Sequence, residues 1–286
     1  MRIRHRYGVG MGTNYENYSV LMSVYYKENP EQLSESLESI LNQTVKTNDF
    51  VLVCDGPLNE ELDGVIDEYQ SKFGGILNVV RLPENGGLGK ALNEGMKHCK
   101  DELIGRMDSD DISYPDRFER QLRVFREYPE IAICSGIVEE FENSISDVTC
   151  KRVVPEKHED ILAFSKKRNP FNHPCVMYKK SKVEEAGGYM DFPLLEDYYL
   201  WVRMLKNGAI GYNIQEPILW MRAGNGMYER RAGWKYVISQ KRFFDELYKA
   251  GYISLKERNS SVITRAAVSL IPNIVRKKAF KVMVRK

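Results

Sequence analysis

The sequence is poor in the residues that build zinc sites and disulfide frameworks. Only five cysteines and four histidines occur among 286 residues, and no two cysteines form a Cys-x-x-Cys pair. An odd number of cysteines in a chain of this length does not predict a disulfide framework and indicates a reducing compartment. Cys54 and Cys134 stand in apolar runs, where a cysteine behaves as a small buried hydrophobe.

Long apolar runs and a strong charge of either sign are also missing. No stretch approaches the roughly 20 apolar residues that a transmembrane helix needs, and the basic, polar N-terminus lacks the apolar core of a secretory signal. We therefore expect a cytoplasmic protein. The formal net charge is only +2, so general nucleic-acid binding is not expected.

What the sequence does contain is a regular alternation of two patterns. Apolar runs at residues 19–25, 50–54, 77–82, 103–107 and 131–138 are typical of buried strands. Between them, and again near residues 198–206, apolar residues recur at helical spacing, and the chain beyond Gly233 has a helical pattern to its end. This alternation predicts βαβ units and a mostly parallel sheet flanked by helices, that is, an α/β fold.

Polar residues follow three of the predicted strands directly. Tyr25, Asp55 and Asp108 each stand where an apolar run ends. Ligands of parallel α/β sheets bind outside the carboxyl ends of the strands. We therefore expect a binding site that contains these residues.

The run Asp108-Ser109-Asp110-Asp111 is the sharpest of these signals. Alternate residues of an extended chain point to the same side, so Asp108 and Asp110 can face one ligand. Two close carboxylates repel each other unless a cation or hydrogen-bond donors share their site, and oxygen ligands suit Mg²⁺ or Mn²⁺. A solvated acidic turn before a helix is the alternative.

Seven segments, taken in order, resemble glycosyltransferase family 2 and cover about Ser19 to Arg222. The DxDD form and the later GNGMYERR are most similar to bacterial transferases that build O-antigen, capsule or exopolysaccharide. The resemblance implies a GT-A fold and an inverting, metal-dependent transfer of a sugar from a nucleoside diphosphate. The segments are SVLMSVYYKENPEQLSESLESILNQT, VLVCDGP, NGGLGKALNEG, IGRMDSDD, FNHPCVMYKK, GGY and LLEDYYLWVRMLKNG.

For the donor, the resemblance implies roles residue by residue. Asp55 matches the aspartate that accepts a hydrogen bond from uracil, which favours a UDP-sugar. Asp108 matches a residue near the ribose, and Asp110 matches the ligand of Mn²⁺ or Mg²⁺. The matching nucleotide-pocket positions are Ser23, Tyr25 and Glu28. Many relatives carry Pro in place of Ser23 and Asp in place of Cys54.

The glycine-rich run 85–90 precedes a predicted helix. Glycines permit close backbone approach, and a helix N-terminus favours anions. In the family this loop borders the donor pocket, so Lys90 is either a donor contact or a solvated lysine of the first turn. The spacing is not that of a nucleoside-triphosphate-binding loop.

An inverting transfer needs a base that takes the proton of the attacking hydroxyl. Glu196-Asp197 matches the family's ED motif, which implies that Asp197 is the base and Glu196 a neighbour. Both are also acids that suit the first turn of a helix, where the dipole favours them. The segment with His173 matches the acceptor side, and on that side we expect Trp201 to pack in the core beside the site.

Two further segments carry clustered basic residues. Residues 265–286 hold seven Lys and Arg side chains, no Asp or Glu, and interleaved apolar residues. This pattern fits either the anionic cytoplasmic face of a membrane or a helix that packs on the catalytic domain. Arg230 and Arg231 follow two glycines and belong either to a lid over the donor diphosphate or to a surface loop.

We therefore predict an N-terminal lead-in (1–17), a GT-A domain (18–232; donor half about 18–138, acceptor half about 139–232) and a basic helical C-terminal extension (233–286). The expected activity joins a sugar from a UDP-hexose or UDP-N-acetylhexosamine, in β-linkage, to a glycan acceptor carried on polyprenyl diphosphate. The alternatives are a sugar-nucleotide pyrophosphorylase and a non-catalytic glycan-binding module. The pyrophosphorylase would need a glycine-rich basic loop after the first strand, where SVYYKENP stands instead.

Overall fold

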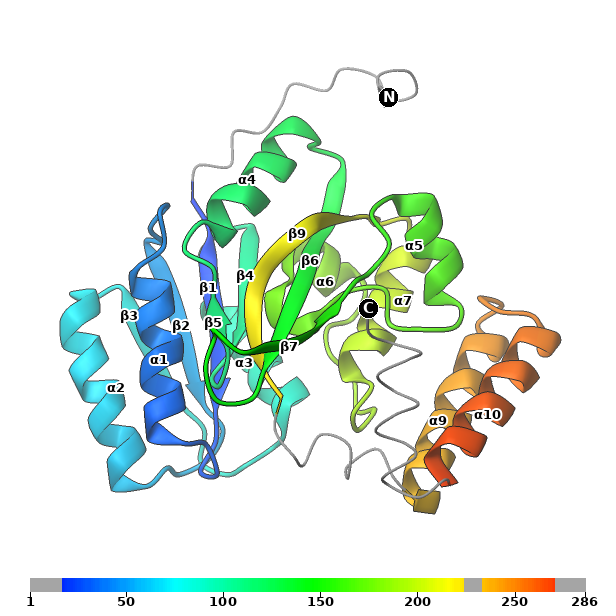
Figure 1. Cartoon of the computed structure of the whole chain (residues 1–286), viewed down its shortest axis with the longest axis horizontal. Coiled ribbons are helices and arrows are strands. Elements are labelled where there is room, and N and C mark those ends of the chain that lie inside the picture. Colours follow the sequence, from blue (N-terminus) through cyan, green and yellow to red (C-terminus); the bar gives the residue numbers. More distant parts are fainter. Residues whose placement is uncertain (1–16, 224–232, 271–286) are drawn as a thin grey trace.

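The computed structural model describes residues 17–223 and 233–270. Its described residues form one nine-stranded mixed sheet with helices on both faces (Figure 1). The first half confirms the predicted alternation, with small shifts at the ends of elements. It runs β1 (Ser19–Val24), α1 (Pro30–Leu41), β2 (Asp49–Cys54), α2 (Glu60–Phe73), β3 (Leu77–Arg81), α3 (Leu88–His98) and β4 (Leu103–Asp108).

The start of α1 shows how the sequence sets these boundaries. The Asn29 side chain accepts hydrogen bonds from the backbone N–H groups of Glu31 and Gln32, and Pro30 occupies the first turn. Proline is suited there because its missing N–H would have no partner inside the helix, and its φ is already helical. An Asn-Pro pair therefore ends the loop after β1 and begins the helix.

Four parallel strands place the predicted site residues at one edge of the sheet. The strands run in the order β3-β2-β1-β4. Ser23 pairs with Val53 on one side and with Asp108 on the other. The carboxyl ends of β1, β2 and β4 therefore lie together, as the polar residues after these strands predicted.

The second half departs from simple βαβ order. Beyond β4 the sheet continues as β8-β6-β9-β5, and β7 pairs with β6. The short strand β8 is antiparallel to β4, whereas the long strands β6 and β9 are parallel to each other. Strand β6 was predicted to end at Val138 but extends to Phe141, because its pairing with β9 continues to Arg222. The bounds are β5 (Ile112–Ser113), β6 (Ile131–Phe141), β7 (Val148–Arg152), β8 (Met177–Lys179) and β9 (Ile210–Arg222).

Helices cover both faces of this sheet and bury one hydrophobic core on each. Apolar residues of α1, α2 and α4 (Arg117–Glu127) pack on one face. Those of α3, α5 (His158–Ser165), α6 (Lys180–Glu185) and α7 (Glu196–Lys206) pack on the other. Two buried layers of this size explain why the sheet is a rigid frame for residues at its edge.

A helical hairpin follows the sheet and packs on α7. It consists of α9 (Gly233–Lys249) and α10 (Leu255–Leu270), and Tyr198 and Val202 of α7 share a third core with Phe243 and Leu247 of α9. The predicted helical extension is thus present, with a break at Gly251, where φ is +68°. The end of the predicted basic segment, residues 271–286, lies outside the described part. No helix among the described residues is long and apolar enough to cross a membrane.

Candidate active site

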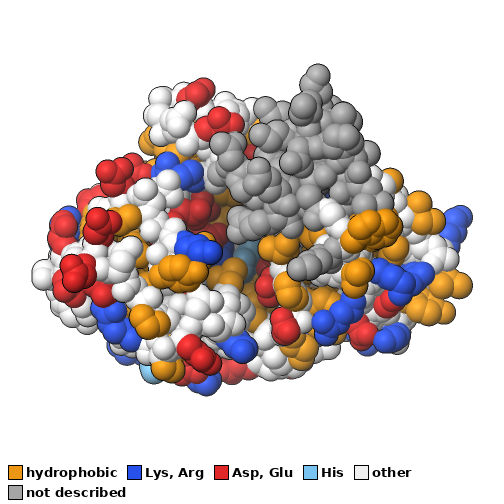
Figure 2. All heavy atoms as spheres, turned by 90° about the horizontal axis from the view of Figure 1, so that it is seen from below, with side chains coloured by type: hydrophobic (Ala, Val, Ile, Leu, Met, Phe, Trp, Pro, Cys, Tyr) orange, Lys and Arg blue, Asp and Glu red, His pale blue; other side chains and the backbone are white. Residues whose placement is uncertain are grey.

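A cavity of about 1760 Å³ opens at the carboxyl ends of β1, β2 and β4 and extends to α10. Figure 2 shows this hollow from below, with Asp and Glu side chains around it. The cavity brings together most of the residues predicted from sequence. These are Ser23, Tyr25, Glu28, Asp55, Asp108, Asp110, His173, Glu196 and Asp197.

Two predicted residues within the described part of the chain, Lys90 and Trp201, are not among those that line the cavity. Lys90 is exposed on the first turn of α3, and its side chain packs beside Gly86. Trp201 is 0% exposed and belongs to the core behind the site. This agrees with the expected core packing beside the site, although Trp201 does not itself line the acceptor side of the cavity. Arg230 and Arg231 lie outside the described residues, as does the rest of the predicted lid.

Asp55 and the glycine loop form one unit at the end of β2. The two carboxylate oxygens of Asp55 accept hydrogen bonds from Gly86 N–H (2.7 Å) and Gly87 N–H (3.0 Å). The Asn85 amide donates to the Asp55 backbone oxygen (3.1 Å). Gly87 has a φ of +88°, which a residue with a Cβ adopts rarely. The loop is thus folded onto Asp55, a link that the sequence analysis did not make.

Asp108 is held by an arginine that sequence reasoning missed. Arg106 stands two residues earlier on β4, with 1% of its side chain exposed. Its guanidinium donates to both carboxylate oxygens of Asp108, at 2.5 Å in one bond and more closely in the other. Forked donors match a carboxylate well. The available signal was a basic residue inside an apolar strand, at the alternate position that shares a face with Asp108.

Asp110 and Asp111, unlike Asp108, make no ion pair with any of the described residues. Burial, followed by repulsion from Asp108 and Glu28, raises the pKa of Asp110 to about 7. Burial and the same cluster also hold the pKa of Asp111 well above its ordinary value. Asp111 accepts a hydrogen bond from Arg222 N–H (2.8 Å), but its second oxygen is buried without a partner.

These three carboxylates have the composition of a divalent-cation site. Asp108, Asp110 and Asp111 each offer an oxygen, and the three oxygens lie within 4.8 Å of one another. The raised pKa of Asp110 and the orphaned oxygen of Asp111 are both what a cation would relieve. Asp110 faces the cavity and Asp111 does not, so Asp110 is the ligand best placed to share a cation with a bound substrate.

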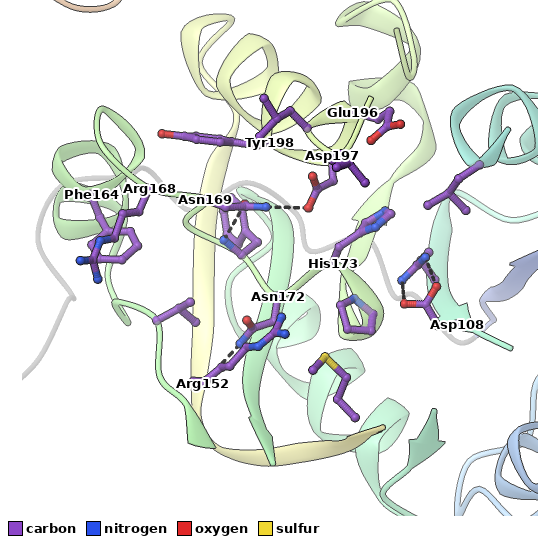
Figure 3. Close-up of a pocket in the computed structure, with 18 of the residues that line it drawn as sticks. Asp108, Arg152, Phe164, Arg168, Asn169, Asn172, His173, Glu196, Asp197 and Tyr198 are labelled. Carbon is purple, nitrogen blue, oxygen red and sulfur yellow. Dashed lines mark hydrogen bonds and ion pairs between the residues drawn. The ribbon is translucent and has the colours of Figure 1, made fainter. Parts of the chain in front are cut away.

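Asp197 and Glu196 begin α7 on the opposite wall. The Asp197 carboxylate accepts a hydrogen bond from the Asn169 amide at 2.5 Å, as drawn in Figure 3. Leu194, just before them, is the one described non-glycine residue with positive φ, +67°. Such strain persists only where the surrounding structure holds it. Burial, and then the charge of Asp197, raises the pKa of Glu196.

His173 lies between the two walls. Its Nε2 is 3.0 Å from the Tyr189 hydroxyl, and its ring packs edge-on against Trp201 at 6.0 Å between centroids. Burial and the charge of Arg106 hold the pKa of His173 well below its ordinary value. The imidazole is therefore neutral at physiological pH and suits hydrogen bonding in the site more than charge neutralisation.

The sequence analysis did not predict that the residues at the far end of the cavity line one site. Asn169, Arg168 and Lys167 reach it from the loop after α5, and Lys256 and Arg265 reach it from α10. These residues come from segments about 90 positions apart in sequence. No local motif marks them, and only the packing of α10 beside the α5 loop brings them together.

The geometry thus places a carboxylate cluster at the carboxyl ends of parallel strands, in the same cavity as Glu196 and Asp197. Residues 19–187 match the sequence profile of Glycosyl transferase family 2. The chain therefore belongs to glycosyltransferase family 2.

Its relatives include bacterial enzymes of surface-polysaccharide synthesis. The chain is 39% identical over 278 residues to the Escherichia coli UDP-Gal:alpha-D-GlcNAc-diphosphoundecaprenol beta-1,3-galactosyltransferase, covering 96% of this chain and 99% of that one. It is 37% identical over 266 residues to the amylovoran biosynthesis glycosyltransferase AmsE of Erwinia amylovora, covering 93% and 96%. An uncharacterized glycosyltransferase of Haemophilus influenzae is 40% identical over 269 residues, covering 94% and 99%.

Solved structures confirm that the fold is GT-A. S. aureus TarS 1–349 in complex with UDP-GlcNAc superposes with a TM-score of 0.66 at 16% identity, over 94% of this chain and 76% of that one. The mannosyltransferase PcManGT of Pyrobaculum calidifontis, in complex with GDP-Man and Mn²⁺, gives 0.60 at 14% identity, over 93% and 80%.

Proposed function

We propose that this glycosyltransferase is inverting and metal-dependent, and that it transfers a hexose or N-acetylhexosamine from UDP to a sugar carried on polyprenyl diphosphate. The observation that carries this proposal is that Asp110 and Asp197 line one and the same cavity. The name of the E. coli relative supports both a UDP-sugar donor and a diphosphate-linked acceptor. The product would be a unit of O-antigen, capsule or exopolysaccharide.

The donor end of the cavity supports a bound nucleoside. Asp55 is fixed by Gly86 and Gly87, so its remaining lone pairs keep a constant position toward a uracil N–H. Glu28 accepts a hydrogen bond from the Ser109 hydroxyl at 2.6 Å, which ties the loop after β1 to the acidic cluster. Ser23, Tyr25 and Asp108 line the space between. We propose these residues as the nucleoside pocket.

The acidic cluster would hold Mn²⁺ or Mg²⁺ through Asp110, with Asp108 and Asp111 beside it. When bound, such a cation supplies positive charge for the diphosphate leaving group. The protein's own contribution is to keep these carboxylates fixed and partly desolvated. Arg106 does this for Asp108, and the Arg222 backbone does it for Asp111.

Asp197 is our proposed general base. The Asn169 amide fixes one of its oxygens, and the N-terminus of α7 favours its ionised form. An acceptor hydroxyl between Asp197 and the donor would lose its proton as it attacks the anomeric carbon in line. A single displacement inverts that carbon, so a UDP-α-sugar gives a β-linkage.

Membrane attachment at the cytoplasmic face is the remaining part of the proposal. Three large apolar side chains of the hairpin are unusually exposed, namely Trp234 (68%), Ile238 (64%) and Ile263 (68%). Trp234 and Ile238 are four residues apart and share one face of α9. These exposed apolar side chains, together with the basic residues that the sequence holds at 265–286, fit an anionic lipid surface, which is where a polyprenyl-linked acceptor resides.

A donor screen tests the function. Purified protein with Mn²⁺ is offered a panel of UDP- and GDP-sugars and an alkyl-diphospho-α-GlcNAc acceptor, and nucleotide release is measured with and without acceptor. We expect release from a UDP-sugar that depends on the acceptor, and a β-linked product by NMR. An α-linked product would reject single displacement, and hydrolysis that ignores the acceptor would reject transfer. The pyrophosphorylase and the glycan-binding module predict no glycosidic product.

A further inference from the structure

The two ends of the cavity carry opposite charge. At the donor end, Glu28, Asp55, Asp108 and Asp110 line it, and the one cation among the described lining residues there is Arg106, which already pairs with Asp108. Beyond Asp197 the balance reverses, because the described lining residues there include five cations and one carboxylate, Glu257. The five are Arg152, Lys167, Arg168, Lys256 and Arg265.

Not all of these charges are available to a ligand. Arg152 is neutralised by buried Glu140 at 2.5 Å. Glu257 is engaged at the start of α10, where one of its oxygens accepts from both the N–H and the hydroxyl of Ser254, each at 2.8 Å. With Arg152 offset by Glu140, the cations Lys167, Arg168, Lys256 and Arg265 still outnumber the one carboxylate, Glu257, at this end of the cavity. Arg168 and Arg265 have partners of their own within the protein.

Arg265 has a bridging role. Its guanidinium donates to the Gln240 side chain (2.9 Å) and to the Lys167 backbone oxygen (2.8 Å), and it stacks over Phe244 at 5.2 Å. These contacts fix the Lys167 backbone against the α9–α10 hairpin. The position of Lys167 relative to Lys256 is therefore set by the fold.

The two lysines themselves have no internal partner. The side chains of Lys167 and Lys256 are exposed at the cavity wall. Neither ammonium makes a hydrogen bond or a close ion pair with the part of the chain that the structure describes. The charge of Lys167 does reach Glu257, where it helps Ser254 and Lys166 to lower the pKa of that carboxyl. Two unpaired cations that face one cavity repel each other, and an anion between them removes that repulsion.

The distance between Lys167 and Asp197 also fits one acceptor that contacts both. Lys167 stands two residues before Asn169, whose amide holds Asp197, and two residues of chain span at most about 7 Å. In Figure 3, Arg168 and Asp108 lie on opposite sides of Asp197 and Asn169. A sugar ring with a hydroxyl at Asp197 would direct the substituent on its other side toward the lysines.

We propose that Lys167 and Lys256, with Arg168 beside them, bind the diphosphate that links the acceptor sugar to its lipid. This inference rests on the proposed function. It also gives the two diphosphates of the reaction different partners. The donor diphosphate meets carboxylates and needs a cation there, whereas the acceptor diphosphate meets side-chain cations and needs no metal.

Binding titrations test the site without relying on turnover. The probes are alkyl-diphospho-α-GlcNAc and the neutral alkyl α-glycoside of the same sugar, each titrated in EDTA. Wild-type protein should bind the diphosphate about tenfold or more tightly than the glycoside, since charge-assisted contacts contribute about 1.5–3 kcal/mol. Lys167→Ala/Lys256→Ala should lose that preference and bind the glycoside as before. Lys249→Ala removes an exposed lysine of the same hairpin and should change nothing.

Three results would overturn the inference. The first is equal binding of both probes by wild-type protein, and the second is an unchanged preference in the double variant. The third is a loss of affinity for UDP with Mn²⁺ in that variant, which would mean that the lysines bind the donor. Circular dichroism confirms folding, and Lys→Gln at both positions serves as a second variant that keeps the side-chain length. Failure of the donor screen would reject the proposed function. The binding titrations would still show whether the lysines bind a diphosphate, because they do not depend on transfer.

Discussion

Arg106 and Asp108 stand two residues apart on β4 and form a forked ion pair where the strand enters the cavity. The arginine is 1% exposed and the aspartate 31%. The first carboxylate of the acidic cluster is therefore neutralised by the sheet itself. Asp110 and Asp111 have no such partner within residues 17–223 and 233–270. Asp108 is therefore held by the protein itself, whereas Asp110 and Asp111 are the residues suited to bind a cation.

The first prediction concerns that pair. Arg106→Met should lower the free energy of unfolding by about 3 kcal/mol, because it leaves Asp108 partly buried beside two further carboxylates. Urea denaturation measures this. Arg123→Met is the control, because Arg123 makes an exposed i,i+4 pair with Glu119 and should cost less than about 1 kcal/mol. Equal losses in both variants would mean that the buried Arg106 pair stabilises the fold no more than an exposed ion pair does.

The second prediction concerns Asp110 and pH. Its pKa of about 7 in the folded protein exceeds the unfolded value of about 3.9, so metal-free protein loses stability as pH rises through this range. Asp110→Asn should raise the Tm of metal-free protein at pH 8 and leave it nearly unchanged at pH 4. Mn²⁺ should raise the Tm of wild-type protein only.

Activity gives the companion measurement. EDTA should abolish transfer by wild-type protein, and Asp110→Asn should lose most transfer with Mn²⁺ present. Full activity in EDTA, or a Tm increase with Mn²⁺ that the variant retains, would contradict a cation at Asp110.

The third prediction concerns the base. Asp197→Asn keeps the shape of the side chain but removes the proton acceptor, so transfer should fall by about 10²–10⁴-fold. Affinity for the UDP-sugar, measured by calorimetry, should stay unchanged. Asn169→Ala should lower kcat by less, because the carboxylate remains and only its orientation is lost. Near-normal turnover of Asp197→Asn would reassign the base, with Glu196 as the first substitute.

The fourth prediction concerns the effect of Glu196 on stability. Burial raises its pKa, so its ionised form destabilises the fold once the pH exceeds the ordinary value of about 4.3. Glu196→Gln should therefore raise the Tm at pH 8 and have little effect near pH 4. Glu61→Gln is the control, because Glu61 is exposed in the first turn of α2. A larger gain at pH 4 than at pH 8 would reverse the assigned sign.

The donor half could be predicted because its signals are local. The apolar run of β1, the Asn29-Pro30 helix start and the Asp108–Asp111 cluster each lie within a few residues. The family resemblance added the pairing of this cluster with Asp197. Arg106 was missed because its partner is evident only when β4 is seen as a strand with one face on the site.

The second half of the sheet resisted prediction for a physical reason. Strand β8 has only three residues and is antiparallel to β4, too short to show a period. The cations beyond Asp197 gather because Arg265 of α10 binds the Lys167 backbone, a contact across 98 positions of sequence. For Lys90 the motif left a donor contact and a solvated lysine of the first turn both open, and the structure shows its side chain exposed on that turn.

The pairing of β6 with β9 has a consequence for how the protein is made. All eleven residues of β6 are buried, yet its partner β9 begins only at Ile210, 69 residues after β6 ends at Phe141. At about 5–20 residues per second, a ribosome needs roughly 3–14 s to synthesise that interval. Throughout it, one edge of an apolar strand stays open to other chains. The emerging polypeptide therefore has a defined window in which a chaperone would protect it, and the window closes when β9 leaves the ribosome.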